Sequence, residues 1–330
     1  MLNILVVGGA GYIGSHMVKY LSQNDCKVVT VDNLSSGYRD AIVFGEFIEG
    51  DISEVEFLRQ IFEKHQFDVV MHFASFIQVG ESVREPTKYY QNNVVNTLNL
   101  LSVMKEFNVD KFVFSSSAAI FGEPETRLIT ENHPKNPLNP YGKSKLMVEQ
   151  ILEDFAKGYQ LNSVSLRYFN AAGADPEGEL GERHLPETHL IPLVLQVASK
   201  RRDSISVYGN DYDTPDGTCI RDYVHVSDLC SAHWLAVKTL VNGASGHQAF
   251  NLGSGKGFSV REVIDVAQKV TGRPIPNVVE SRRSGDPACL VADSTYAKSV
   301  LGWKPQFGKL EEIIKDAWNW EVKNFILNNH

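Results

Sequence analysis

Short runs of aliphatic and β-branched residues alternate, along the first half of the chain, with longer stretches whose apolar residues recur every three or four positions. This alternation is typical of βαβ units, in which the connecting helices bury both faces of a parallel sheet. We therefore expect six strands with helical crossovers. The strands are expected at Asn3–Val7, Lys27–Val31, Phe47–Glu49, Val69–Phe73, Lys111–Ser115 and Ser163–Phe169, and the helices at Tyr12–Ser22, Glu54–Lys64, Pro86–Phe107 and Tyr141–Gly158.

The chain becomes richer in glycine, proline and charged residues after about Asn170, although helical spacing persists. We interpret the second half as a smaller C-terminal α/β lobe, which divides the chain into residues 1–170 and 171–330. The sequence contains no repeat and no flexible linker, so the boundary is soft and chain from the second half can return to the first. Helices are expected here at Pro192–Lys200, Ser227–Val241, Ser259–Thr271 and Lys309–Phe325.

The buried face of one helix can also be predicted. Val94, Leu98, Leu101 and Met104 follow one another at spacings of three and four residues, which places them on one stripe of the Pro86–Phe107 helix. We expect this stripe to face the core.

The composition is that of an ordinary globular protein. Of the 330 residues, 32 are lysine or arginine and 40 are aspartate or glutamate, which gives a formal net charge of −8. Nonspecific nucleic-acid binding is not expected, because it needs a basic surface that displaces counterions from phosphates. No apolar run approaches the roughly 18 residues that would span a bilayer, and no basic region of a signal peptide precedes the first strand. We therefore expect a cytoplasmic protein without membrane or nucleic-acid partners.

The four cysteines lie far apart, without a C-x-x-C pair. This spacing fits neither a disulfide framework nor a zinc site, so we expect reduced thiols and no metal. The cysteines are Cys26, Cys219, Cys230 and Cys289.

A glycine-rich turn follows the first expected strand, where residues 8–14 read Gly-Gly-Ala-Gly-Tyr-Ile-Gly and lead into the first helix. Glycines let the backbone approach a pyrophosphate, whose charge then lies at the positive end of the helix. The second strand ends at Asp32, where a carboxylate accepts hydrogen bonds from adenosine ribose hydroxyls and repels a 2′-phosphate. This order predicts a Rossmann-like, doubly wound sheet that binds NAD. Arg39, downstream, leaves NADP as the alternative.

A second pattern, Tyr141-x-x-x-Lys145, opens a helix after Asn139-Pro140, which reads as an N-cap and a first-turn proline. The spacing places both side chains on one helix face. A free phenol has a pKa of about 10, so a tyrosine that acts as a base needs nearby positive charge, which Lys145 would supply. Ser117 ends a neighbouring strand, where parallel sheets bind ligands, and is interpreted as orienting a substrate alcohol.

With these motifs in this order, the sequence resembles the extended short-chain dehydrogenase/reductase family, and within it the UDP-glucose 4-epimerases. The matching motifs span nearly the whole chain. They are Gly-Tyr-Ile-Gly-Ser-His at 11–16, Asp-Asn-Leu at 32–34, Gly-Asp-Ile at 50–52, His-Phe-Ala at 72–74, Val-Gly-Glu-Ser at 79–82, Arg-Tyr-Phe-Asn at 167–170, Gly-Thr at 217–218, Arg-Asp-Tyr at 221–223 and Arg-Arg-Ser-Gly-Asp at 282–286.

The resemblance implies a tightly bound NAD that oxidises and then reduces the same sugar. Tyr141 would take the proton of the sugar 4-hydroxyl, Ser117 would hydrogen-bond the same oxygen, and Lys145 would hold the nicotinamide ribose and tune Tyr141. The transient 4-keto sugar would turn about its diphosphate linkage and receive the hydride on its other face. UDP-galactose and UDP-glucose would thereby interconvert.

The resemblance also implies a homodimer and two sets of contacts. The subunits would pair through the Pro86 and Tyr141 helices. The implied cofactor contacts are Gly8, Gly11, Tyr12, Ile13, Gly14, Asp32, Asn33, Leu34, Ser35, Ser36, Asp51, Ile52, Phe73, Ala74, Ser75, Asn92, Tyr141, Lys145 and Phe169. The implied contacts to the UDP-sugar are Ser117, Tyr141, Asn170, Leu190, Tyr208, Arg221, Arg283 and Asp286.

The sequence departs from the family pattern at three places. Ile77 and Gln78 stand where some members carry a lysine that reaches the cofactor, which implies weaker NAD retention. His189 stands where a substrate-contacting asparagine is often found. Leu290 occupies the wall position that helps decide whether an N-acetyl group fits, so UDP-N-acetylglucosamine stays open as a substrate.

Three other functions use some of the same motifs. A 4-epimerase of another UDP-sugar, such as a pentose, a uronate or UDP-N-acetylglucosamine, would use the same catalytic residues. A nucleotide-sugar 4,6-dehydratase needs an acid and a base beside the active-site hydroxyl, whereas no acid follows Ser117 before Glu123. A noncatalytic NAD-sensing module would not need Tyr141 and Lys145.

Overall fold

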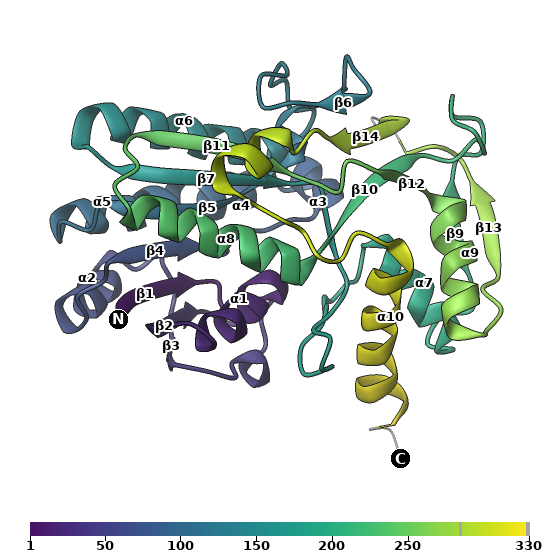
Figure 1. The fold of residues 1–330 in the computed structure, drawn as a ribbon, viewed down its shortest axis with the longest axis horizontal. Coiled ribbons are helices and arrows are strands. Elements are labelled where there is room, and N and C mark those ends of the chain that lie inside the picture. The colour runs from purple at the N-terminus through teal and green to yellow at the C-terminus, as the bar shows by residue number, and fades with distance from the viewer. Residues whose placement is uncertain (284–285, 328–330) are drawn as a thin grey trace.

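The computed structural model describes residues 1–283 and 286–327, and its central layer is a seven-stranded sheet whose neighbouring strands run parallel (Figure 1). The order across the sheet is β11-β7-β5-β4-β1-β2-β3, so the chain winds outward in both directions from β1. The predicted doubly wound α/β fold is confirmed. The strands are β1 (Leu2–Val7), β2 (Cys26–Asp32), β3 (Glu46–Glu49), β4 (Val69–His72), β5 (Lys111–Ser117), β7 (Asn162–Tyr168) and β11 (His247–Leu252).

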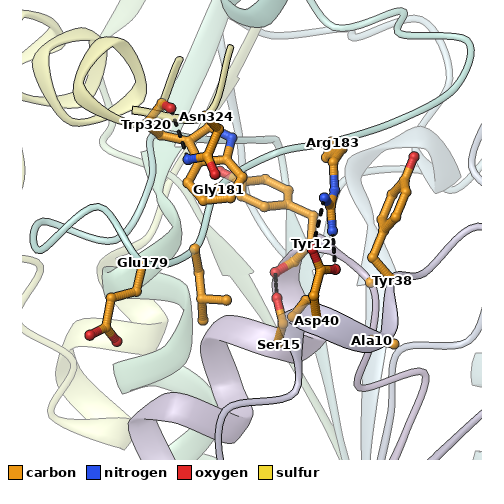
Figure 2. A pocket seen from close by; sticks show the side chains of 13 residues that line it. Ala10, Tyr12, Ser15, Tyr38, Asp40, Glu179, Gly181, Arg183, Trp320 and Asn324 are labelled. Atoms are coloured by element: carbon orange, nitrogen blue, oxygen red, sulfur yellow. Dashed lines mark hydrogen bonds and ion pairs between the residues drawn. The ribbon is translucent and has the colours of Figure 1, made fainter. Parts of the chain in front are cut away.

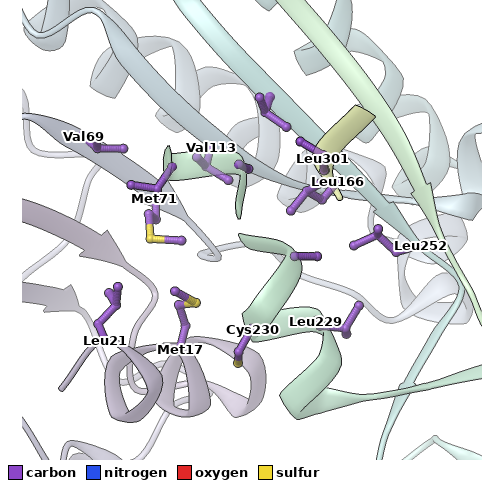
Figure 3. Packing of buried hydrophobic residues seen from close by; sticks show 14 of the residues in the cluster. Met17, Leu21, Val69, Met71, Val113, Leu166, Leu229, Cys230, Leu252 and Leu301 are labelled. Atoms are coloured by element: carbon purple, nitrogen blue, oxygen red, sulfur yellow. The ribbon is translucent and has the colours of Figure 1, made fainter. Parts of the chain in front are cut away.

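The sheet is covered on both faces because successive side chains of a strand point to opposite sides. In β1, Ile4 and Val6 belong to one buried cluster, whereas Leu5 and Val7 belong to the other. Figure 3 shows the first cluster, in which Met17 packs beneath the sheet. Helices α1 (Tyr12–Ser22) and α8 (Val226–Val241) close this face, and α2 (Val55–Lys64), α5 (Asn96–Glu106) and α6 (Pro140–Tyr159) close the other.

The edge strand β11 was not among the predicted strands. It pairs with β7 in parallel, with Phe250 opposite Leu166, and α8, which precedes it, packs against α1. Its first residues, His247 and Gln248, are polar, so the local pattern is too weak to indicate a strand. The chain after residue 170 therefore supplies a strand and a helix to the N-terminal layer.

The expected Pro86–Phe107 helix forms as one continuous helix that contains a wide, π-helical turn. Helix α4 (Pro86–Tyr90) leads into a wide turn at Gln91–Val95 before α5 begins, and the Asn96 N–H bonds to the Gln91 carbonyl five residues earlier. Such wide turns are frequent at functional sites. Here the turn carries Asn93, whose side-chain amide bonds both backbone groups of Phe76 at 2.9 and 3.1 Å.

The prediction that Leu98 faces the core is wrong, because 38% of it is exposed. The buried face of α5 is centred instead on Thr97, whose hydroxyl contacts His72 Nε2 at 3.2 Å and donates to the Asn93 carbonyl at 2.9 Å. A polar residue can occupy a core position when its hydrogen bonds are satisfied, and a hydrophobic pattern cannot anticipate this.

Helices and short strands after residue 170 pack beside the large sheet. Helices α7 (Leu190–Ala198), α9 (Val260–Thr271) and α10 (Leu310–Glu321) share a separate buried cluster. The cluster packs against β8 (Asn170–Ala172), β9 (Ile205–Tyr208), β10 (Ile220–His225) and β12 (Gly257–Ser259). The lobe also contains β6 (Leu128–Ile129), β13 (Asn277–Glu280) and β14 (Cys289–Ala292).

All four cysteines carry free thiols. Among the helices of the described residues, none combines the length and the apolar character that a bilayer span requires.

A buried ion pair joins the end of β5 to α6 and β7. Arg167 and Glu149 contact each other through two guanidinium nitrogens, and Ser116 donates to the same carboxylate at 2.6 Å. Burial would raise the pKa of Glu149, but Arg167 and Ser116 hold it below the usual value. Both members of the pair are almost inaccessible to solvent.

We predict that Arg167→Met destabilises the chain by about 3–5 kcal/mol, because the Glu149 carboxylate would stay buried without a counter-charge. The double variant Glu149→Met/Arg167→Met should lose much less, since both charges leave together. Urea unfolding of the three proteins, followed by circular dichroism, measures the difference. Equal losses in the single and double variants would contradict this account.

Candidate active site

The carboxyl ends of five strands meet at one edge of the sheet, on both sides of the point where the strand order reverses between β1 and β4. Ligands of doubly wound sheets bind in this crevice. Gly8 follows β1, Asp32 ends β2, Phe73 follows β4, Ser117 ends β5 and Phe169 follows β7. The topology therefore gathers residues that are far apart in the sequence.

The glycine turn after β1 requires its glycines. Gly8 has φ of +81°, and a Cβ on it would lie 2.4 Å from the Ala74 nitrogen. A Cβ on Gly14 would lie 2.2 Å from the Gly8 carbonyl oxygen. The N-cap residue, Gly11, places no side chain over the first turn of α1, which includes Tyr12 and Ile13. The first N–H groups of the helix are thus left for an anion such as a pyrophosphate.

Asp32 is buried and aimed back at this turn. One carboxylate oxygen accepts the Ala10 N–H at 2.9 Å, and the other accepts the Leu34 N–H at 2.8 Å. Burial raises the pKa of Asp32, and these two hydrogen bonds oppose the rise. Each oxygen keeps a lone pair that can accept a bond from a ribose hydroxyl.

The segment after Asp32 is held by a second carboxylate. Asn33 donates to Asp51 at 2.6 Å, Asp51 accepts the Ser53 N–H at 2.7 Å, and Ser35 N–H donates to the Asn33 side chain at 3.0 Å. Burial raises the pKa of Asp51, but these bonds bring it below the usual value. Leu34 and Ser36 lie in the same turn, and Ile52 is buried beside it.

The segment after β4 connects the turn to the catalytic helix. The Phe73 N–H donates to the Val7 carbonyl at 2.7 Å, and Ala74 lies directly against Gly8. Ser75 receives a hydrogen bond from Lys145 at 2.8 Å.

Asn92 is the implied cofactor contact on the wide turn, and it donates to Asn93 at 2.9 Å. Asn93, which the sequence analysis did not include, also donates to Ser144 at 3.0 Å. Asn93 therefore links the wide turn to α6. Its sequence signal was weak, since it is one amide in a run of polar residues before an apolar helix.

Tyr141 and Ser117 lie together at the start of α6 and the end of β5. Asn139 caps this helix, accepting the Gly142 N–H at 2.9 Å, and the predicted first-turn proline follows it. Burial raises the pKa of the Tyr141 phenol, and hydrogen bonding with the Ser117 side chain opposes the rise. Ser117 itself accepts the Ala119 N–H at 3.1 Å. A partly buried phenol with a hydroxyl partner suits proton transfer once a positive charge stabilises its anion.

Lys145, one turn along the helix, is the candidate for that charge. Its Nζ donates to the Ser115 carbonyl at 2.7 Å, and it lies 5.9 Å from the centre of the Tyr141 ring. Only 2% of Lys145 is exposed, and burial lowers its pKa to about 7, although Glu149 opposes the change.

The features of the edge fit a dinucleotide. The glycine cradle has no room for a Cβ, the helix N-terminus is uncapped, and Asp32 presents a carboxylate at the end of the next strand. The sheet edge would hold NAD along these groups, with Lys145 and Tyr141 at its far end.

Four of the implied substrate residues lie in the C-terminal lobe and form two contacts there. Arg221 pairs with Asp286, and the Arg283 guanidinium lies 3.9 Å from the centre of the Tyr208 ring. Guanidinium groups are suited to a diphosphate because their N–H groups match its oxygens. Tyr208 lies partly in solvent, and residues 284 and 285 of the Arg-Arg-Ser-Gly-Asp motif lie outside the described residues.

Other implied contacts link the two lobes. Asn170 donates to the Asp222 carbonyl at 3.0 Å, and Leu190 begins α7. Leu290 lies opposite Arg221 in the register of β14 with β10. Leu290 and Phe169 pack on one small cluster with Ile120, in the short helix after Ser117. Leu290, at the implied sugar wall, and the segment after Ser117 thus share an apolar support.

The loop between β8 and α7 lies over the dinucleotide turn. Arg183 pairs with Asp40 and stacks on Tyr38 at 3.6 Å, and the Tyr12 hydroxyl donates to the Gly173 carbonyl at 2.7 Å. Figure 2 shows the pocket formed there, with Arg183 reaching across to Asp40. This pocket lies beside the glycine turn, and Tyr141 is not among the residues that line it.

Comparison with known proteins gives a consistent result. The model of the NAD dependent epimerase/dehydratase family matches residues 4–253. The UDP-glucose 4-epimerase of Halalkalibacterium halodurans is 52% identical over 322 residues, covering 97% of this chain and 96% of that protein. A crystal structure of a UDP-glucose 4-epimerase superimposes with a TM-score of 0.95 at 51% identity, covering 98% of each chain. The Brucella ovis UDP-glucose 4-epimerase, solved in complex with NAD, gives 0.94 at 48% identity, covering 96% of this chain and 98% of that one.

The family match includes the glycine turn, Asp32, Ser117, Tyr141 and Lys145. Relatives about half identical to the chain extend the similarity through the C-terminal lobe. The chain belongs to the NAD dependent epimerase/dehydratase family.

Proposed function

We propose that this chain interconverts UDP-galactose and UDP-glucose by inverting C4 of the hexose, with NAD as its resident cofactor. The observation that carries this proposal is the grouping of Tyr141, Ser117 and Lys145 at the sheet edge, beside a turn built for a dinucleotide. The same residues occur in a chain about half identical to UDP-glucose 4-epimerases, one of which was solved with NAD.

Tyr141 handles the proton in both directions. Its phenol oxygen takes the proton of the sugar 4-hydroxyl and later returns it to the same oxygen, while Ser117 hydrogen-bonds that oxygen and fixes its position. A charged Lys145 lowers the cost of forming the phenolate in a buried site. The chemistry that bound NAD supplies is reversible uptake and return of a hydride at C4.

The C-terminal lobe, in this proposal, binds the UDP portion and leaves the sugar free to turn. Arg221 and Arg283 hold the diphosphate, and Asp286 and Asn170 contact the nucleotide sugar. Inversion requires that the hexose present each face of C4 in turn, so the strong contacts belong on the nucleotide and not on the sugar. Dehydration is disfavoured, because the apolar segment Ala118–Ile120 follows Ser117 where a dehydratase needs an acid and a base.

We also propose a cytoplasmic homodimer. The free thiols support a reducing compartment. Exposed apolar side chains on the wide turn, α5 and α6, which include Val95, Leu98 and Met147, support pairing through these helices. An apolar line of this kind on two adjacent helices is typical of a buried contact between subunits.

The direct test is incubation of the purified chain with UDP-galactose, first without added NAD. Anion-exchange chromatography follows UDP-glucose, and absorbance follows NADH. Conversion without net NADH is the expected result. Activity that requires added NAD would point to weak retention at Ile77, and activity on UDP-N-acetylglucosamine alone would move the assignment to that sugar.

We predict that Tyr141→Phe lowers turnover by about 10²–10⁴-fold, because it removes the group that transfers the proton. Cofactor content, measured by absorbance after denaturation, should stay the same. The matched control is Tyr159→Phe, which changes an exposed tyrosine at the other end of α6. Unchanged function in Tyr141→Phe would favour a noncatalytic NAD sensor.

We predict that wild-type chain freed of cofactor gains stability relative to Lys145→Met as pH rises from about 7 toward 10.5. In this range the unfolded chain binds a proton at Lys145 that the folded chain does not, so the free energy of unfolding rises with pH. Below pH 7 both states are protonated and the difference is constant. Urea titrations across this range measure it, with Lys143→Met as the surface control. A difference that falls with pH would contradict the prediction.

We predict that Leu98→Glu combined with Met147→Glu converts a two-chain particle into a single chain, since the charges would be buried in the proposed contact. Light scattering after gel filtration gives the mass. Lys157→Glu, on the last turn of α6, is the control and should leave the dimer intact. A wild-type chain that is already a monomer would overturn the dimer proposal.

A further inference from the structure

The loop that covers the dinucleotide turn carries a compact group of histidines and carboxylates. Glu182, His184, Glu187 and His189 each present one ligand atom, and these four atoms all lie within 4.8 Å of one another. The side chains of Glu182 and Glu187 are only 5% and 6% exposed. The spacing in the sequence is Glu-x-His-x-x-Glu-x-His, so eight residues supply the whole group.

The two histidines approach the carboxylates through the same ring atom. His184 Nδ1 lies 3.3 Å from Glu182 and 3.6 Å from Glu187. His189 Nδ1 lies 2.5 Å from Glu182 and 3.6 Å from Glu187. Zinc bonds of about 2.0–2.2 Å put neighbouring ligand atoms of a tetrahedron about 3.3–3.6 Å apart. Three of the four distances match that separation. The fourth, between His189 Nδ1 and Glu182, is shorter and would have to lengthen when the ion binds.

The two carboxylates of this group pair with its own two histidines, whereas other acids of the same loop pair with a lysine. In the same loop, Asp175, Glu177 and Glu179 all contact Lys19, at 2.8, 2.7 and 2.9 Å. Within residues 1–283 and 286–327, neither Glu182 nor Glu187 forms an ion pair with a lysine or an arginine. A buried carboxylate needs an oppositely charged partner or a bound metal ion. Two imidazoles and two carboxylates form a donor set that suits zinc.

We propose that Glu182, His184, Glu187 and His189 form a zinc site that fastens this loop over the dinucleotide turn. This departs from the expectation of no metal, which rested on the cysteines. The ion is structural, because four protein ligands complete its coordination. The metal test does not require the activity assigned above, but one ligand, His189, directly precedes the implied substrate contact Leu190.

The contacts of the group give the ion a defined role. The His184 ring packs edge-on against Tyr12, with 6.3 Å between ring centres, and Tyr12 lies in the first turn of α1. His189 immediately precedes α7, where Leu190 is an implied substrate contact. Arg183, between two of the ligands, reaches Asp40 across the turn (Figure 2). A bound ion would therefore hold the dinucleotide turn and the start of α7 in one arrangement.

The first test measures the metal itself. Elemental analysis of the purified full chain is expected to give close to one zinc per chain, and cobalt added after chelation should give the visible absorption of a tetrahedral ion. His184→Gln should weaken zinc binding at least about tenfold, as loss of even an outer partner does. His189→Gln, a more exposed position, is the second variant if the first does not fold.

The matched control is Glu177→Gln, which changes an exposed acid of the same loop that pairs with Lys19. It should retain zinc. Equal metal content in wild type and His184→Gln, or a cobalt spectrum like that of the aqueous ion, would overturn the proposal and leave a cluster that holds protons only.

The second test measures whether the ion stabilises the loop. Hydrogen exchange of residues 173–189 should become about tenfold faster or more when zinc is removed from wild type, because a bound ligand suppresses local opening. The same treatment should not change the exchange of His184→Gln. Zinc binding without any change in exchange would overturn the fastening role.

Discussion

The ammonium group of Lys145 is buried, and its two hydrogen-bond partners in the described chain are neutral oxygens, those of Ser75 and Ser115. Removing a cation from water is costly, so this lysine stays in place only because the surrounding elements are fixed. The partners come from the ends of β4 and β5, and the lysine comes from α6. Its lowered pKa expresses the cost. An anion formed at Tyr141 would lower this cost, because it would place a negative charge near the buried ammonium group.

The elements around Lys145 are held in place by interactions that do not involve Tyr141 or Ser117. Glu149, one turn further along α6, is paired with Arg167 of β7, and this pair also holds Ser116 between the two serines of the site. Asn93 secures the opposite side by joining the segment after β4 to α6. Each link satisfies a buried polar group, so the positions of Tyr141, Lys145 and Ser117 are determined by complete hydrogen bonding as well as by apolar packing.

The two lobes exchange chain, which places the second half of the molecule in contact with the catalytic edge. β11 and α8 complete the N-terminal sheet and its cover, whereas β6, from the first half, pairs with β14 of the lobe. Leu290 in β14 and Phe169 after β7 share one apolar cluster. The lobe and the sheet are therefore joined at several places along the chain. Motion during turnover is therefore expected in the loops at the edge, of which the loop before α7 is the best anchored.

The sequence by itself determined the elements with a strong period, the glycine turn with Asp32, and the Tyr141–Lys145 pair, because each depends on residues close together in the chain. Local spacing also indicated the start of α6 through Asn139 and its proline. Only the tertiary structure decided that β11 joins the sheet edge, that Leu98 faces outward while Thr97 is buried, and that Glu149 pairs with Arg167. The contacts that settle these points join residues brought together by the fold. The group at Glu182 shows the limit most clearly, since its spacing is visible in the sequence but its convergence depends on the path of the loop. The role of a polar side chain depends on its hydrogen-bond or ion-pair partner, and in these cases the partner is distant in the sequence and is brought close by the fold.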